Sequence, residues 1–336
     1  MGRFAPLIAA FFIAAFGGCT GTSSSDDGDI PGRGEWIVYS VAPTILGDAQ
    51  LYRIRADGTQ KLILTDPFNK SNDEAAWSPD GNLLIFSSSR NFPAGATPNQ
   101  RMLWKTTLDG IFQTKVTQNT IEHCVEHNGQ ASADNKVVVF TLACDNVLGG
   151  TPLVYKVNTD GTGQTRVAPD TLVAAHAEQS PVFSGNGGRI VFTASFGDPV
   201  FSYELYAMDA DGKNTQRLTS LAAQGRTIIG RLTPIGNSVY FETASLPGLA
   251  DAQLEAINID GTGATVLYKI RNISIPGGGG VVPEDSDFGV SPNRQSIVFA
   301  RWNANADRKM LMVAGADGTN PTLIDASGFA SYPTWK

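Results

Sequence analysis

The three histidines of the chain lie in two short segments, where they could hold a metal ion. Glu122-His123-Cys124-Val125-Glu126-His127 carries two of them, and His176-Ala177-Glu178 carries the third. Imidazole nitrogens combined with carboxylate oxygens suit a divalent ion such as zinc or manganese. The spacing matches no specific metal signature. A metal site built from His123, His127 and His176 therefore stands against the alternative that these are exposed or hydrogen-bonded loop residues.

Two of the three cysteines are placed so that they could form a disulfide. Cys124 precedes one predicted strand, and Cys144 follows the next strand along the chain. Adjacent antiparallel strands place the start of one beside the end of the other. We expect a Cys124–Cys144 disulfide, which needs a Cα separation of about 4.4–6.8 Å. Two unpaired thiols are the alternative.

No sequence motif in the chain indicates a specific catalysed reaction. The Gly-x-Ser-x-Gly turn that carries the nucleophile of many hydrolases does not occur. The four consecutive glycines at 277–280 lack the strand, the helix and the lysine that a phosphate-binding loop requires. We expect these glycines in a flexible loop.

A series of six Asp-Gly pairs recurs at intervals of 49 to 57 residues, and Asp80-Gly81 is a further pair outside this series. An apolar residue stands six positions before each Asp and another stands seven positions after it. Glycine accepts a positive φ and aspartate tolerates it, so the pair favours a tight turn between two strands. The pairs are at 57–58, 109–110, 160–161, 211–212, 260–261 and 317–318.

A compact run of β-branched and aromatic residues precedes each of these hairpins, as in Ile190-Val191-Phe192. Such runs suit strands that are buried on both faces. Five of the six follow a turn such as Ser78-Pro79-Asp80-Gly81, and a short strand precedes each turn. Each unit of about 50 residues thus holds four strands, which we name A to D from the inside outward.

Four antiparallel strands per repeat are typical of the blade of a β-propeller. The first unit lacks its strand A, and the C-terminal segment Tyr332-Pro333-Thr334-Trp335 matches the strand that ends at Trp77. The sequence therefore predicts an all-β fold, a six-bladed β-propeller of four-stranded antiparallel blades. The C-terminal strand closes the ring by joining the first blade.

The N-terminal residues have the pattern of a targeting segment. Arg3 is followed by a short apolar run that ends at Gly18-Cys19, which resembles the cleavage site of bacterial lipoproteins. Residues 20–34 contain one large apolar residue and cannot build a core. We expect a lipoprotein signal peptide at 1–18, a lipid-anchored flexible tether at 19–34 with Cys19 lipidated, and the propeller at 35–336.

One face of the predicted propeller collects both the histidines and a set of acidic residues. The loops from strand D to the next strand A share this face with the loops between strands B and C. Carboxylates there could bind a cation or a basic partner, and a solvated rim is the alternative. The candidate binding face comprises Asp73, Glu74, Glu126, His127, His176, Glu178 and Asp285.

Two motifs resemble the repeat of TolB-like propellers. One is Trp77-Ser78-Pro79-Asp80-Gly81-Asn82-Leu83-Leu84-Ile85-Phe86, continuing to Arg90. The other is Leu205-Tyr206-Ala207-Met208-Asp209-Ala210-Asp211-Gly212 with the following Gln216-Arg217-Leu218-Thr219. The resemblance covers residues 35–336 and implies a propeller that docks other proteins. We expect a short tether before the propeller, where TolB carries a separate α/β domain.

These observations favour a non-catalytic cell-envelope lipoprotein. Its formal net charge of −7 argues against a nucleic-acid partner, which would require a basic face. We expect a monomer without a resident cofactor, held by its N-terminal lipid in the outer membrane and facing the periplasm or the surface. Its partner would be another envelope protein. The alternative is a carbohydrate-active or metal-dependent propeller, either an enzyme or a glycan-binding module, with a site at the channel mouth.

Overall fold

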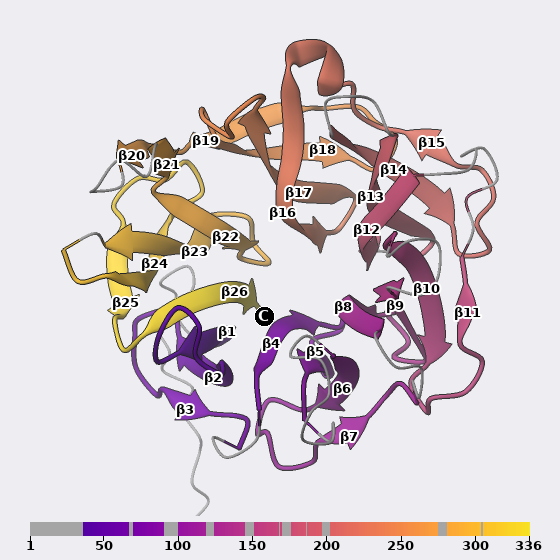
Figure 1. Ribbon diagram of the computed structural model, residues 1–336, viewed down its shortest axis with the longest axis horizontal. Helices are drawn as coiled ribbons and strands as arrows, with labels where there is room; N and C mark the ends of the chain where they lie inside the picture. Colours follow the sequence, from indigo (N-terminus) through magenta and orange to yellow (C-terminus); the bar gives the residue numbers. More distant parts are fainter. Residues whose placement is uncertain are drawn as a thin grey trace, which may run out of the picture.

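Six four-stranded antiparallel sheets are arranged in a ring around a common centre (Figure 1). This computed structural model describes residues 36–66, 70–90, 100–118, 124–144, 151–167, 169, 176–185, 187–196, 202–274, 281–303 and 305–336. The predicted six-bladed β-propeller is confirmed. The expected signal peptide, the tether, Cys19 and His123 lie outside the described residues.

The first three blades follow one another along the chain. From the inside outward, blade 1 consists of β26 (Phe329–Trp335), β1 (Trp36–Ala42), β2 (Gln50–Arg55) and β3 (Leu62–Ile63). Blade 2 consists of β4 (Asn72–Trp77), β5 (Leu84–Ser88), β6 (Met102–Thr106) and β7 (Thr114–Lys115). Blade 3 consists of β8 (Cys124–Ala131), β9 (Val137–Cys144), β10 (Leu153–Asn158) and β11 (Thr165–Arg166).

The other three blades repeat this order. Blade 4 consists of β12 (His176–Phe183), β13 (Arg189–Phe196), β14 (Tyr203–Asp209) and β15 (Gln216–Arg217). Blade 5 consists of β16 (Arg226–Ile235), β17 (Ser238–Ser245), β18 (Gln253–Asn258) and β19 (Thr265–Lys269). Blade 6 consists of β22 (Asp285–Val290), β23 (Ser296–Asn303), β24 (Arg308–Gly315) and β25 (Thr322–Asp325).

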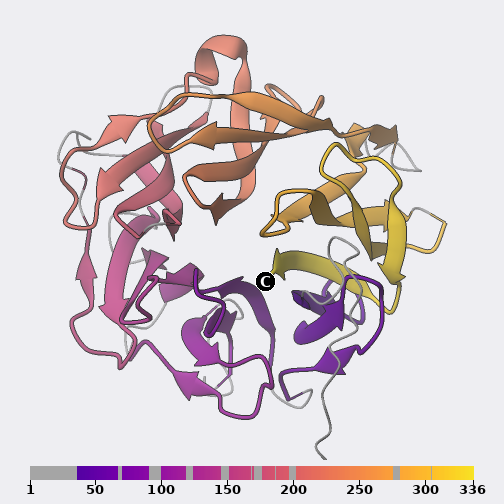
Figure 2. The same ribbon diagram turned by 180° about the vertical axis from the view of Figure 1, so that it is seen from behind.

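The ring is closed by the two ends of the folded chain. Strand β26 pairs antiparallel with β1, with Ile37 opposite Trp335 and Val41 opposite Ala330. Both views show the yellow C-terminal strand beside the indigo first strand (Figures 1 and 2). The predicted closure is confirmed, and it removes an unpaired strand edge that would otherwise invite association with other chains.

The core lies between neighbouring blades. The last aromatic residue of each strand-B run is at most 2% exposed: Tyr39, Phe86, Phe140, Phe192, Phe241 and Phe299. Trp77 packs with Val38 of the preceding blade, and Trp335 packs with Val298 of blade 6. Each blade thus buries its faces against its two neighbours, which is the main source of stability.

The Asp-Gly turns form as their residues require. Every one of these six glycines has a positive φ, between 71° and 90°. At the first turn Gly58 N–H donates to the carbonyl of Arg55 at 2.9 Å, and the Asp57 carboxylate accepts from Thr59 N–H at 2.9 Å. The local chemistry of two residues therefore fixes the connection between strands C and D in every blade.

Two segments differ from the sequence-based expectation. Residues 281–283, which directly follow the four glycines expected in a loop, form β21 (Val281–Pro283), which pairs with β20 (Asn272–Ser274). The segment that ends at His127, expected as a loop, is already strand from Cys124 onward because β8 pairs with β9 along this length.

Cys124 stands opposite Cys144 in that pairing, and a disulfide joins them with a Cα separation of 4.1 Å.

Helices contribute little to the described part of the chain. One short 3-10 turn, η2 (Ala222–Gln224), precedes β16. No helix in the described ranges is long and apolar enough to cross a membrane.

Candidate functional site: the central channel

The six innermost strands carry the same bulge at the same level of the channel. In each of them the pairing with strand B shifts at this point, and the residue that follows the shift has a positive φ of 50–79°. Such a φ is uncommon outside glycine, and a bulge redirects the side chains next to it. These six residues, which we call the bulge ring, are Glu74, Asn128, Ser180, Gly230, Asp287 and Tyr332.

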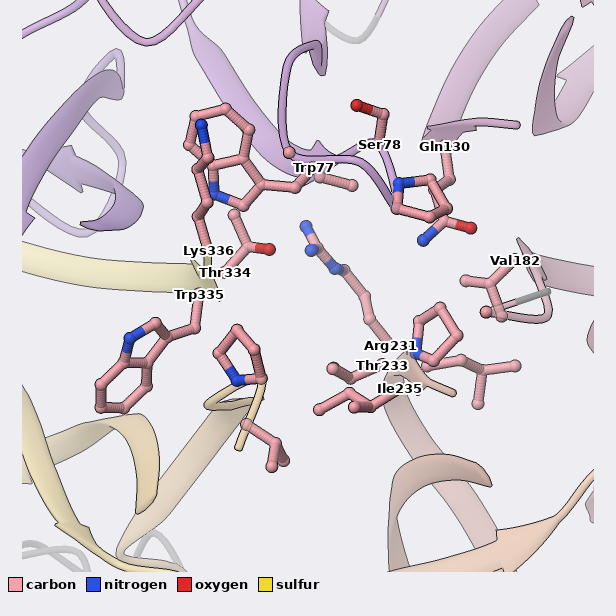
Figure 3. A pocket seen from close by; sticks show the side chains of 18 of the residues that line it. Trp77, Ser78, Gln130, Val182, Arg231, Thr233, Ile235, Thr334, Trp335 and Lys336 are labelled. Carbon is pink, nitrogen blue, oxygen red and sulfur yellow. The ribbon is translucent and has the colours of Figure 1, made fainter. Parts of the chain in front are cut away.

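Blade 5 has one residue more in its bulge than the other blades. Between Ile229 and Thr233 three residues are unpaired, whereas two are unpaired in the corresponding stretch from Asp73 to Ala76. Leu232 remains buried in the core beside blade 4. The additional residue is Arg231, whose side chain projects into the channel (Figure 3).

Arg231 reaches across the ring to the opposite blade. Its Nη2 donates a hydrogen bond of 2.9 Å to the carbonyl of Ala75 in blade 2. Its guanidinium carbon lies 5.4 Å from the centroid of the Tyr332 ring, within the range of a cation–π contact. Burial lowers the pKa of Arg231, but an arginine stays protonated in proteins. The channel is thus crossed by a fixed positive charge.

A second group of charges surrounds Glu74. His127 Nδ1 lies 3.0 Å from Glu74 Oε1, and the N–H of Asn128 donates to Glu74 Oε2 at 3.1 Å. Burial opposes the ionisation of both partners, yet their mutual charge lowers the pKa of Glu74 and raises that of His127. Asp73 forms an ion pair with Arg101, the residue immediately before β6. Two of the predicted acidic residues and one predicted histidine therefore meet at the channel.

Two more ionisable side chains at this level are held in their neutral forms. Burial, with the negative charge of Asp287, raises the pKa of Glu242 to about 8. Burial, with the charges of Glu74 and Asp287, raises the pKa of the Tyr332 hydroxyl. Asp287 itself lies 3.4 Å from the Lys309 ammonium. Asp73, Glu74 and Asp287 thus each have a cation within ion-pair distance, whereas Glu242 has none among the described residues.

A cavity of about 310 Å³ occupies the channel on the side of the turns between strands A and B (Figure 3). Arg231 points toward its middle, and Lys336 lies over the Trp77 ring at 5.3 Å from the centroid. The wall includes the apolar side chains of Trp77, Val182, Leu232, Ile235 and Val290, and the polar ones of Gln130, Ser180 and Thr233. A mostly apolar hollow with a few converging polar groups is the usual form of a small-ligand site.

Three residues of the predicted binding face are structural instead. Glu126, Glu178 and Asp285 are fully buried, so they do not form a solvated rim. Glu126 and Glu178 accept backbone hydrogen bonds from Leu103 and Val154 in strand C of the preceding blade, at 3.0 and 2.9 Å. Asp285 bonds Arg301 and the hydroxyl of Tyr268. Their carboxylates hold blades together, because buried backbone donors need an acceptor.

The expected metal site is only partly visible. His127 pairs with Glu74, His123 lies outside the described residues, and β12 begins at His176, whose side chain is not described. Within the described ranges no group of three or more histidine, cysteine, aspartate or glutamate side chains could hold an ion. A metal at His123, His127 and His176 stays a sequence-based hypothesis.

Sequence reasoning missed Arg231, the most distinctive residue of the channel. In the other five inner strands, the residue that follows the bulge ring is small or apolar: Ala75, Gly129, Pro181, Phe288 and Pro333. The one indication in the sequence was that an arginine follows the bulge ring in blade 5 alone. This can be recognised only when the six inner strands are aligned by their bulges.

The channel and its ring can be compared with solved structures. TolB from Acinetobacter baumannii matches with a TM-score of 0.66 at 18% identity, covering 90% of this chain and 67% of that one. The fold is that of a TolB-like propeller. A second TolB, from Agrobacterium tumefaciens, matches with a TM-score of 0.55 at 16% identity, covering 87% and 89% of the two chains. No family model matches the sequence, and neither does any curated protein.

The TolB-like ring also resembles propellers with other roles. The propeller of a nidogen/laminin complex matches with a TM-score of 0.58 at 10% identity, covering 90% of this chain and 98% of that one. An oligogalacturonate lyase in complex with manganese matches with a TM-score of 0.53 at 12% identity, covering 85% and 77%. At such identities the likeness concerns the fold, and function must be argued from the site.

Proposed function

We propose that this chain is a non-catalytic envelope lipoprotein that serves as a protein-binding scaffold. Its docking surface is the loop face, which we define as the side carrying the B–C loops and the connections from strand D to the next strand A. The described part of that face includes residues 43–49 in blade 1. The lipid at Cys19 and the outer-membrane location follow from the sequence pattern and belong to the same proposal.

The main observation in support of this docking surface is a pair of exposed aliphatic side chains on the loop face. Ile45 is 70% exposed and Leu46 is 94% exposed. Their segment is held in place, since Gly47 N–H donates to the Thr44 carbonyl at 3.0 Å and Asn72 N–H of blade 2 donates to the Ala49 carbonyl at 2.8 Å. Adjacent apolar side chains that are displayed on a fixed loop favour contact with another protein.

Two further observations support this proposal. Trp302 and Phe329, which end β23 and begin β26 on the same side of the ring, stack at 6.1 Å between ring centroids and are partly exposed. Aromatic side chains are enriched among the residues that dominate binding energy. The TolB and nidogen/laminin structures share this fold, and the second was solved as a complex of two proteins.

The test is photo-crosslinking in intact cells with a photoreactive residue at position 46 or at position 112. Phe112 is 76% exposed but lies in the turn between strands C and D, on the opposite side of the ring. It is therefore a matched control for exposed apolar character. We expect one defined protein adduct from position 46, which Ile45→Glu weakens, and none from position 112.

Equal adducts from both positions would show that apolar exposure alone causes capture, and the scaffold proposal would fail. If position 46 gives no adduct, the metal-dependent or carbohydrate-binding alternative gains weight, which the likeness to the manganese-bound lyase favours. Manganese binding by the purified protein would then be measured first, with His127→Gln as the comparison.

A further inference from the structure

Arg231 is a channel cation without a carboxylate partner. No acidic oxygen of the described residues lies within ion-pair distance of its guanidinium, whereas Arg101, Lys309 and His127 each have one. Among the described residues, its guanidinium donates one hydrogen bond, to a backbone carbonyl, and its Nη1 is closed off from solvent with no hydrogen-bond partner. Charges removed from bulk water are normally paired, because desolvation is otherwise costly. An unpaired guanidinium beside a cavity therefore indicates a missing anion.

The surrounding charges set how much negative charge the cavity accepts. Asp73, Glu74 and Asp287 are the acidic groups that act on Arg231. Each is matched by its own cation: Arg101, His127 and Lys309 respectively. The Arg231 charge is left over when these pairs are complete. Lys336 and Asp80 also line the cavity and contribute one charge of each sign, so a single negative charge still completes the balance. A dianion would meet the three carboxylates with too little compensation.

The geometry points to a binding site for a small organic carboxylate in this cavity, with Arg231 as the anion-binding residue. A planar carboxylate matches the planar guanidinium, which offers several N–H donors on one edge. The apolar wall at Trp77, Val182 and Leu232 suits the body of the ligand, and Gln130, Ser180 and Thr233 offer polar contacts. The site opens on the side opposite the loop face. It is therefore independent of the scaffold function proposed above.

Isothermal titration calorimetry with matched probes tests the inference. The probes are mandelate, its neutral amide mandelamide, and inorganic phosphate as a dianion at pH 8. The full-length protein and two variants are compared, Arg231→Met and Arg294→Met. Arg294 also donates to a backbone carbonyl of another blade, that of Ile235 at 2.8 Å, but it is exposed and does not line the cavity.

We expect saturable binding of mandelate to the native chain, about tenfold or more weaker binding of mandelamide, and a similar loss in Arg231→Met. Arg294→Met should bind mandelate as the native chain does. Unchanged mandelate binding in Arg231→Met, no saturable binding to the native protein, or a preference for phosphate would each overturn the inference.

The melting curve of Arg231→Met shows whether this variant folds. If it does not fold, a second variant tests whether binding depends on the charge at position 231. Arg231→Lys keeps the charge but loses the paired donors of the guanidinium. It should retain measurable mandelate binding, weaker than that of the native protein and still stronger than its binding of mandelamide. Equal binding of the acid and the amide by this variant would contradict a charge-based site.

Discussion

The pKa of Glu242 depends on the packing of this residue between two blades of the ring. It lies in strand B of blade 5, and its Oε1 accepts a hydrogen bond of 3.1 Å from Phe288 N–H of blade 6. No cation forms an ion pair with it in the described residues. Burial raises its pKa to about 8, so the folded protein keeps a proton that the unfolded chain releases above its ordinary value of about 4.5.

The sign of the resulting pH effect follows from this difference in proton binding. As pH rises from about 4.5 to about 8, the unfolded state loses the Glu242 proton first, so folding becomes less favourable. The slope approaches about 1.4 kcal/mol per pH unit. Glu242→Gln removes the effect, so its advantage over the native protein should grow between pH 5 and pH 8 in urea titrations. A constant difference at both pH values would contradict a raised pKa.

At the scale of the element, the additional residue in the bulge of β16 requires the glycine that precedes it. Gly230 has a φ of +79°, and a Cβ at this position would lie 3.1 Å from Glu242 Oε1. The left-handed conformation lets the strand accommodate three unpaired residues and turn Arg231 into the channel. In the other five blades, where two residues are unpaired, the ring position carries a side chain.

Gly230→Ala should therefore destabilise the protein more than a glycine substitution that meets open space. Gly225 is the matched control, since its φ is +66° and a Cβ added there would have no neighbour within 4 Å. We expect a loss of about 1–2 kcal/mol for Gly225→Ala from the backbone alone. The loss for Gly230→Ala should be greater by about 1 kcal/mol, because the buried carboxyl must move. Equal losses in guanidinium titrations would show that Glu242 does not constrain this position.

The whole molecule is held together by its last strand. Strand β26 supplies the inner strand of blade 1, and Trp335 is 7% exposed in the cluster between blades 6 and 1. Tyr332 of the same strand belongs to the bulge ring and contacts Arg231. Removing β26 would expose the edge of β1 and the apolar surface of two blades.

A chain that stops at Gly328 should consequently melt at a lower temperature and with a broader transition. A synthetic peptide of residues 326–336, added in excess, should raise the melting temperature by restoring the pairing with β1. The same peptide with Trp335→Ala should restore less, because a buried tryptophan contributes about 3–5 kcal/mol. Equal rescue by both peptides, or an unaltered melting curve in the shortened chain, would contradict the closing role of β26.

The number of blades and the closure of the ring were determined by the sequence itself. Six Asp-Gly turns with apolar residues at fixed distances depend on local chemistry, since turn conformation and strand alternation involve residues close in the chain. The likeness of the segment at Trp335 to the segment at Trp77 identified the missing inner strand. The pairing of Cys124 with Cys144 follows from the same alternation of adjacent strands.

The chemistry of the channel was decided by the tertiary structure alone. Glu126 and Glu178 looked like rim carboxylates, but their partners are backbone groups of the preceding blade, 23 and 24 residues away in sequence. Arg231 meets Ala75 from a distance of 156 residues, and one additional residue in a single strand directs it there. The contact of Arg231 with Ala75 joins opposite sides of a closed ring, whereas those of Glu126 and Glu178 join neighbouring blades. The Arg231 contact has no periodic pattern in the sequence because it occurs only once.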